Sequence, residues 1–302
     1  MSSWERDPDG TAAHVLAEMQ RHLDEELAPG LYLVATPIGS LSDITLRALS
    51  VLARADVILC EDTRHSRKLL AHYGVGTPTR PYHEHNAARE RPRVLVDLQA
   101  GRRVALISDA GTPLISDPGL KLVRAVLEAG HRVESLPGPS AVLAALSVAG
   151  LPTDAFFFAG FLPTKTAARR TRIAELKDIP STLVFFEAPL RVAETLADLA
   201  AELGARPAAM ARELTKLHEE VRRAPLNDLA ETLKGETTKG EVVIVVGPPQ
   251  RGEVTDADII AQLRAALADT SLRDASKAIA EALGVSRTRV YDLGLRMTHG
   301  DT

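Results

Sequence analysis

Short apolar runs alternate with amphipathic helical patterns through the first half of the chain, and this alternation limits the fold more than any other feature. The runs span residues 31–35, 57–60 and 104–107. Such continuous apolar runs are typical of strands that are buried on both faces of a parallel sheet. Residues 133–136 form a fourth strand candidate. The pattern predicts an α/β domain with a mostly parallel sheet over residues 30–139.

Each predicted strand ends in a polar loop. The four loops span residues 36–40, 61–65, 108–119 and 137–141. Because parallel sheets bind ligands at the carboxyl ends of their strands, the loops predict one site at one edge of the sheet. Small residues in the loops would let a ligand approach the backbone. The first loop lacks the G-x-G-x-x-G pattern, so dinucleotide binding is not expected.

The rest of the chain divides into three further segments. Residues 140–249 contain aromatic-rich strand candidates among amphipathic helices and predict a second α/β domain with a more mixed sheet. Residues 250–302 predict a helical domain, and residues 1–29 an N-terminal extension in which residues 14–27 could form a short helix. In the first domain, Ser42 and Asp43 are expected to cap the helix that follows the first loop. The length of 302 residues suggests two domains of about 150 residues each, with the two terminal segments as a surplus.

Composition excludes several classes of protein and of site. The net charge of −4 argues against a uniformly basic nucleic-acid binder. A single cysteine, Cys60, forbids an intrachain disulfide and fits a reducing, cytoplasmic location. No apolar run reaches the roughly 20 residues of a membrane span, and the acidic start is unlike a signal peptide. His83 and His85 alternate around Glu84, so on a strand both would share one face. No third ligand stands at usable spacing, so no metal site is expected.

Two charged clusters are candidates for chemistry. Glu61, Asp62 and Arg64 follow the second strand and suit positioning or proton transfer, although surface ion pairing is the commoner explanation for such a run. Lys216 and His218 stand among acids at 212–220, where they could contact a polar substrate or belong to a solvated helix end or strand edge.

Three further segments offer hydrogen-bonding or positively charged groups. The aspartates of the third loop, Asp109 and Asp117, could accept hydrogen bonds from ribose or amine groups. The C-terminal helices have a helix–turn–helix pattern, but their near-neutral charge favours a small helical cap over a nucleic-acid reader. A basic stretch contains Lys165, Arg169, Arg170 and Arg172.

Six motifs, taken in order over about 220 residues, resemble one family. Together they are similar to the tetrapyrrole-methylase-like superfamily and, within it, to the ribosomal RNA small-subunit methyltransferase I group, which methylates a cytidine 2′-hydroxyl. Position 190 departs from the pattern, because it is Leu190 where the family usually has histidine before the arginine. The motifs are residues 33–39 with 43–45, 61–64, 108–113 with 116–119, 137–141, 186–189 with Arg191, and 212–216 with 218–220.

The resemblance implies a cofactor, partners and a binding site. The cofactor would be S-adenosylmethionine, bound in a cleft between the two α/β domains of a cytoplasmic homodimer. The substrate would be 16S ribosomal RNA of the small ribosomal subunit. RNA binding requires positive charge, and the basic stretch with Lys165, Arg169, Arg170 and Arg172 is the best candidate for that surface. The positions that match the family's cofactor contacts are Ile38, Ala110, Gly111, Thr112, Pro113, Ile115, Ser140, Ala141, Phe186 and Leu214.

Methylation of a ribose hydroxyl also requires help with proton removal. The hydroxyl is a weak nucleophile, so a base or a neighbouring cation should assist its deprotonation. The resemblance and the charged clusters leave this role open among several residues, with the 61–64 loop expected to orient the substrate. Arg64 belongs to this orienting loop. The candidates for proton removal are Glu61, Asp62, Lys216 and His218, and of these Lys216 or His218 is expected to assist.

Two other functions compete with this interpretation. A methyltransferase of the same fold could act on a tetrapyrrole or another small substrate, but such relatives usually show a Gly-Asp pair in the first loop. Here that loop is Thr-Pro-Ile-Gly-Ser at 36–40. A DNA-binding regulator could use the C-terminal helices, but their near-neutral charge speaks against it.

Overall fold

The computed structural model describes residues 8–249 and 255–299. The chain forms two compact units, residues 1–248 and residues 249–302, and each is described by itself. Among the described residues, no helix combines the length and the apolar character that crossing a membrane would require.

The first sheet is entirely parallel, as the apolar runs predict. Its strand order is β3-β2-β4-β1-β5. The edge strand β3 is the one that the sequence does not reveal, because it has only three residues and ends in a proline. The bounds are β1 (Gly30–Val34), β2 (Val57–Cys60), β3 (Thr79–Pro81), β4 (Arg103–Ile107) and β5 (Val133–Leu136).

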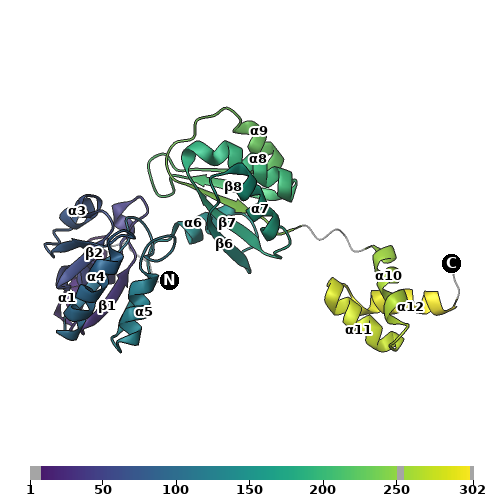
Figure 1. The fold of residues 1–302 in the computed structure, drawn as a ribbon, viewed down its shortest axis with the longest axis horizontal. Coiled ribbons are helices and arrows are strands. Elements are labelled where there is room, and N and C mark those ends of the chain that lie inside the picture. The colour runs from purple at the N-terminus through teal and green to yellow at the C-terminus, as the bar shows by residue number, and fades with distance from the viewer. Residues whose placement is uncertain (1–7, 250–254, 300–302) are drawn as a thin grey trace, which may run out of the picture. The chain divides into compact units, whose positions relative to one another are not determined.

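Helices cover both faces of this sheet (Figure 1). In β2, Ile58 and Cys60 pack on the face that α2 and α3 cover, whereas Val57 and Leu59 pack on the face that α4 and α5 cover. Alternate residues of a strand point to opposite faces, so burial on both sides explains why the strands are apolar throughout. The helices are α2 (Leu46–Arg54), α3 (Thr63–His72), α4 (Ala87–Gln99) and α5 (Leu120–Glu128).

Two predicted details near the N-terminus differ from the structure. The helix expected over residues 14–27 is α1 (Pro8–Asp24), which packs against α2; the Ser50 hydroxyl donates to the His22 carbonyl at 2.9 Å. The expected helix cap at Ser42 and Asp43 lies instead in a 3₁₀ turn (Leu41–Asp43). Thr45 caps α2, because its hydroxyl accepts a hydrogen bond from the Ala48 amide.

The second sheet is mixed, as predicted. Its order is β6-β7-β10-β8-β9; β6 and β7 are parallel, and the other neighbours are antiparallel. The polar strand β9 occupies an edge and lies partly within the segment that the sequence left open. The bounds are β6 (Phe156–Phe161), β7 (Thr182–Glu187), β8 (Pro207–Arg212), β9 (Glu220–Pro225) and β10 (Val242–Val246).

Helices also cover the two faces of the second sheet. One face packs against α7, α8 and α9. The other packs against α6, in a cluster that includes Ile38 from the loop after β1 and Leu214 from the loop after β8. This cluster joins the two sheets of the first unit through shared apolar contacts. The helices are α6 (Ala141–Ala149), α7 (Thr166–Leu176), η2 (Pro189–Arg191), α8 (Val192–Leu203) and α9 (Leu226–Thr232).

The second unit is a three-helix domain with its own small core. It consists of α10 (Asp256–Ala266), α11 (Leu272–Leu283) and α12 (Arg287–His299). Ile259, Ile279 and Val290 meet in its interior, one from each helix. A left-handed glycine, Gly284, ends α11 and turns the chain toward α12.

Candidate active site

The loops after β1 and β4 are joined by their backbones. The Thr36 amide donates to the Gly111 carbonyl at 2.9 Å, and the Gly111 amide returns a bond to the Thr36 carbonyl at 3.0 Å. Gly111 has φ +81°, a conformation that glycine adopts most readily. The Thr36 hydroxyl donates to the Ser108 carbonyl, so the first and third predicted loops form one surface.

The loop after β5 is attached to the same surface. The Thr112 hydroxyl donates to the Pro139 carbonyl at 3.2 Å. A Cβ on Gly111 would lie 3.4 Å from Ile38 Cγ2 and 3.7 Å from the Pro139 carbonyl oxygen. Gly111 is buried at the point where three strand ends meet, and the absence of a side chain leaves its backbone uncovered by one of its own.

The loop after β1 also contacts the second sheet's side of the unit. The Ser40 amide donates to Thr215 Oγ1 at 3.0 Å. A Cβ on Gly39 would stand 2.5 Å from Lys216 Cγ, so the aliphatic part of that lysine lies directly on the glycine. Glu213 and Thr215 have positive φ, which indicates a strained loop held by its surroundings.

The structure brings several of the expected cofactor contacts together. Ile38 and Leu214 are buried in one cluster, and Ala141 and Phe186 pack against it. The Phe186 ring also meets two other aromatic rings edge to face, those of Phe158 at 4.8 Å and Phe161 at 5.6 Å between centroids. Ile115, in contrast, is largely exposed, with 43% of its surface accessible.

Lys216 is held between two carboxylates. Its ammonium donates to Glu213 Oε1 at 2.7 Å and to Glu241 Oε2 at 3.1 Å. Burial tends to lower the pKa of Lys216, but the hydrogen bonds and charges of both carboxylates outweigh it, and the net pKa is raised. A raised pKa fits the expected role of a neighbouring cation better than that of a base. His218, the other candidate in this segment, is exposed.

The first charged cluster separates into residues with different roles. Asp62 is the N-cap of α3 and accepts a bond from the Arg64 amide at 2.8 Å. Hydrogen bonds from the backbone and side chain of Arg64 lower the pKa of Asp62. This carboxylate therefore caps the N-terminus of α3 in its ionised form. The Arg64 side chain is 87% exposed. Glu61 is exposed as well and faces a pocket.

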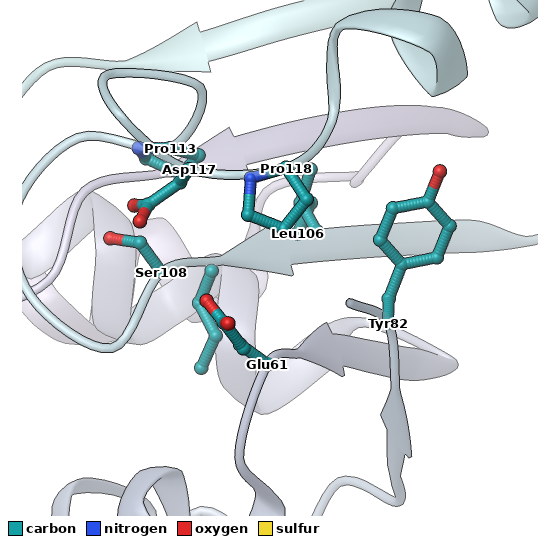
Figure 2. Close-up of a pocket in the computed structure, with 8 residues that line it drawn as sticks. Glu61, Tyr82, Leu106, Ser108, Pro113, Asp117 and Pro118 are labelled. Carbon is teal, nitrogen blue, oxygen red and sulfur yellow. The ribbon is translucent and has the colours of Figure 1, made fainter. Parts of the chain in front are cut away.

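This pocket lies at the carboxyl ends of β2, β3 and β4. Figure 2 shows the Asp117 carboxyl directed toward the Ser108 hydroxyl, while Glu61 extends from the end of β2 toward the same pocket. Tyr82 belongs to the lining and is 1% exposed. The residues that line the pocket are Glu61, Tyr82, Leu106, Ile107, Ser108, Pro113, Asp117 and Pro118.

Asp117 is the most perturbed acid of the pocket. Its burial raises the pKa to about 6, the nearby charges of Glu61 and Asp109 act in the same direction, and hydrogen bonding with Ser108 opposes them. The sequence identifies Asp117 as a hydrogen-bond acceptor but not as a group for proton transfer. Its burial depends on how the loop folds over β4, which the sequence does not display.

The two histidines expected to share one face of a strand do not lie on a strand. β3 ends at Pro81, and His83 and His85 follow it in the turn before α4, with ring centroids 6.0 Å apart. Across residues 8–249 and 255–299, no group of three or more histidine, cysteine or acidic side chains could hold a metal ion.

The basic stretch on α7 is a correction to the sequence-based expectation. Arg169 is only 1% exposed, and its Nε donates to Asp198 Oδ2 at 2.6 Å. Its side chain therefore faces the protein interior and is removed from the candidate RNA surface. Arg170 and Arg172 are exposed but form ion pairs with Glu202 at 2.6 Å and Glu175 at 2.8 Å. Lys165 is exposed at the start of the helix.

The motif around Phe186 has a structural role in addition to its aromatic contact. Glu187 is 2% exposed, and its carboxylate accepts bonds from the Thr195 hydroxyl at 2.6 Å and from the Ala188 amide at 2.7 Å. It also pairs with Arg191. Both carboxylate oxygens of Glu187 therefore have hydrogen-bond partners, as a buried carboxylate requires. Leu190, where the family pattern differs, is 82% exposed.

Comparison with known proteins agrees with this geometry. Residues 30–230 match the family model of the tetrapyrrole (corrin/porphyrin) methylases, and residues 253–298 match the RsmI C-terminal HTH domain. Uroporphyrin-III-C-methyltransferase from Thermus thermophilus superposes with a TM-score of 0.52 at 26% identity, covering 72% of this chain and 94% of its own. Diphthine synthase shares the fold, with a TM-score of 0.57 at 16% identity over 72% of this chain and 89% of its own.

Sequence relatives define the group more narrowly. The ribosomal RNA small subunit methyltransferase I of Mesorhizobium japonicum is 50% identical and covers 91% of this chain and 95% of its own length. The protein of the same name from Escherichia coli O157:H7 is 43% identical, covering 92% and 99%. The chain belongs to the tetrapyrrole methylase family and, within it, to the group of ribosomal RNA small subunit methyltransferases I.

Proposed function

We propose that the chain transfers a methyl group from S-adenosylmethionine to a cytidine 2′-hydroxyl in 16S ribosomal RNA of the small ribosomal subunit. The observation that supports this most is the identity of 43–50% with relatives named ribosomal RNA small subunit methyltransferase I. Those relatives match over about nine-tenths of the chain, whereas uroporphyrin-III-C-methyltransferase covers 72% of it, and residues 253–298 match the RsmI C-terminal HTH domain.

The residues where the strand ends meet fit this methyl donor. The bare backbone at Gly111 and the small side chains of Ala110 and Ala141 leave room for a nucleoside. Ile38 and Leu214 offer apolar contact from opposite sheets. Ser140 stands at the N-terminus of α6, and its hydroxyl makes no capping bond there, so it is free to accept or donate toward a ligand.

The chemistry divides between donor and protein. S-adenosylmethionine supplies an electrophilic methyl carbon on a sulfonium sulfur. The chain supplies alignment, because the backbone bonds between Thr36 and Gly111 and between Ser40 and Thr215 hold the loops in place. The 61–64 loop is proposed to orient the substrate, with the exposed Arg64 next to phosphate or ribose oxygens.

RNA binding is proposed to use scattered positive charges. Lys165 and Arg64 are exposed on the first unit, and Arg170 and Arg172 could exchange their carboxylate partners for phosphates. Exposed cations on the C-terminal unit, such as Arg273 and Arg296, extend this proposal to the helix–turn–helix domain. We also propose a cytoplasmic homodimer, which the family resemblance supports.

Labelled methyl transfer tests this function directly. The protein is incubated with S-adenosylmethionine carrying a labelled methyl group and with small ribosomal subunits from cells that lack the enzyme. The label is expected on a ribose oxygen of a cytidine in the 16S RNA. A label found only when a porphyrinoid replaces the subunits would assign a small-molecule substrate instead, and a label on an RNA base would contradict ribose methylation.

A further inference from the structure

The pocket in Figure 2 contains a carboxyl group whose surroundings suit a proton acceptor. Asp117 belongs to the loop that begins with the expected cofactor contacts at Ala110–Pro113, so it extends from that surface into the pocket at the ends of β2, β3 and β4. The loop is fixed in an unusual shape: Leu114 and Ser116 have φ of 73° and 66°. A Cβ on Gly160 of β6 would meet Ser116 Oγ at 3.6 Å, so the loop also lies against the second sheet.

The pocket places a like charge and a hydroxyl around the carboxyl. Glu61 approaches from β2, and Ser108, which is 5% exposed, stands at the end of β4. The Ser108 hydroxyl donates to the Gly111 carbonyl at 2.9 Å, which links the pocket to the Thr36–Gly111 backbone pair. No cation is among the lining residues, whereas Asp62 pairs with Arg64 and Glu213 pairs with Lys216.

We propose that Asp117 is the catalytic base that accepts the proton of the ribose 2′-hydroxyl, and that Glu61 is a positioning residue whose negative charge raises the basicity of Asp117. This inference rests on the proposed ribose methylation. As the ribose oxygen forms its bond to the methyl carbon and the carbon–sulfur bond breaks, the hydroxyl proton passes to the Asp117 carboxylate. The acid then releases this proton to water, and the sulfur keeps the bonding electrons as a neutral thioether.

The other candidates for this role have less suitable surroundings. Lys216 has a raised pKa between two carboxylates, and Asp62 has a lowered pKa at a helix cap. An efficient base has a pKa near the working pH, and burial raises the pKa of Asp117 to about 6, with the charge of Glu61 adding to that effect. Glu61 after β2 and Asp109 after β4 act on Asp117 by their charge, and Tyr82, whose hydroxyl hydrogen-bonds with Arg91, lines the same pocket.

Asp117→Asn is the first variant to test, because it keeps the shape of the side chain and removes the proton acceptor. With small subunits from cells lacking the enzyme, we expect kcat to fall about 10²- to 10⁴-fold. The affinity for S-adenosylmethionine, measured by calorimetry, is expected to stay within about twofold of that of the unchanged protein, which also reports folding. A variant that binds the cofactor and keeps the full rate would overturn the proposal.

Glu61→Gln tests the coupling between the two carboxyls. Without the neighbouring charge the pKa of Asp117 should fall, so the acidic limb of the pH–rate profile moves to lower pH. Carbon NMR of protein labelled at aspartate carboxyls should show the same shift in the Asp117 resonance, which is assigned by its loss in Asp117→Asn. An acidic limb and resonance that do not move in Glu61→Gln would contradict the role given to Glu61.

The result with the unchanged protein distinguishes a failure of the proposed function from a failure of the assignment of the base. If it places no label on a ribose, the proposed function fails, whatever the variants do. If it methylates ribose and Asp117→Asn does so equally well, the proposed function stands and the assignment of the base is wrong.

Discussion

Two charged regions of the first unit both contain acidic side chains, but these acids are paired with a cation in one region and unpaired in the other. Around Lys216, each charge has a partner: the ammonium contacts Glu213 and Glu241, and the pKa of Glu213 is lowered, chiefly by its hydrogen bond with Lys216. In the pocket, Asp117 faces Glu61, and its pKa is raised. Paired charges stabilise a loop, whereas an unpaired, half-buried acid stays reactive near neutral pH.

A buried arginine offers the largest test of what pairing contributes. In Arg169→Ala, the Asp198 carboxylate would lose a partner at 2.6 Å while remaining 13% exposed. Breaking a buried pair from one side is costly, so we expect the free energy of unfolding to fall by about 3 kcal/mol, measured by urea denaturation. Arg172→Ala, on the same helix but exposed, is the matched control and should change it by less than about 0.5 kcal/mol. Equal effects would contradict the structural role of Arg169.

Asp117→Asn should have the opposite sign, because it removes an unpaired charge. Burial raises the pKa of Asp117 to about 6 in the folded protein, whereas in the unfolded chain this carboxyl has its ordinary pKa of 3.8. The stability of the unchanged protein therefore falls as the pH rises through this window, and the full linkage is about 3 kcal/mol.

The variant carries no such penalty. We expect it to be more stable than the unchanged protein by about 3 kcal/mol at pH 8 and by almost nothing below about pH 3, from thermal unfolding at a series of pH values. A stability difference that is independent of pH would mean that Asp117 is not desolvated in the folded protein.

The sequence predicts the fold better than it predicts these charge states. Apolar runs such as 57–60 specify a strand covered on both faces, and the structure confirms the parallel sheet. β3 and β9 escape detection because the first is three residues long and the second has no apolar alternation; both are strands through pairing with a neighbour. Local sequence encodes periodicity, whereas an edge strand depends on contacts made elsewhere.

The same limit applies to the site. The loops at the strand ends are visible from their position after apolar runs, and the structure joins three of them by hydrogen bonds. The burial of Arg169 depends on Asp198, 29 residues away, and that of Asp117 on the loop closing over β4. Residue type and spacing identify a charge, but only tertiary packing decides whether it is paired, exposed or desolvated.

Lys216→Met tests the region of paired charges around Lys216, where a smaller change in stability is expected. Methionine keeps the apolar stem that packs on Gly39 but leaves Glu213 and Glu241 without their cation. Because Lys216 is partly exposed, solvent screens much of the loss, and we expect a decrease in unfolding free energy of about 1 kcal/mol. The pKa of Glu213 should rise toward its ordinary value.

The kinetic result of the same variant separates the two regions. The Kd of S-adenosylmethionine should increase more than kcat decreases, because the loop that carries Leu214 is loosened while the base remains. A loss of kcat as large as that of Asp117→Asn, with unchanged cofactor affinity, would mean that Lys216 takes part in proton transfer. It would contradict the distinction between a structural region around Lys216 and a reactive pocket around Asp117.

The smallest effect is expected at Lys165, an exposed cation without the buried partner that holds Arg169. Lys165→Ala should leave the free energy of unfolding within about 0.5 kcal/mol of the original value. If this lysine contacts one phosphate, the slope of log affinity for the small ribosomal subunit against log salt concentration should become shallower by less than about 1. Affinities measured at three or more salt concentrations give that slope. An unchanged slope would exclude Lys165 from the RNA surface. The remaining candidates would be Arg64 and the exposed cations of the C-terminal helices, and single alanine variants of each are tested by the same slope.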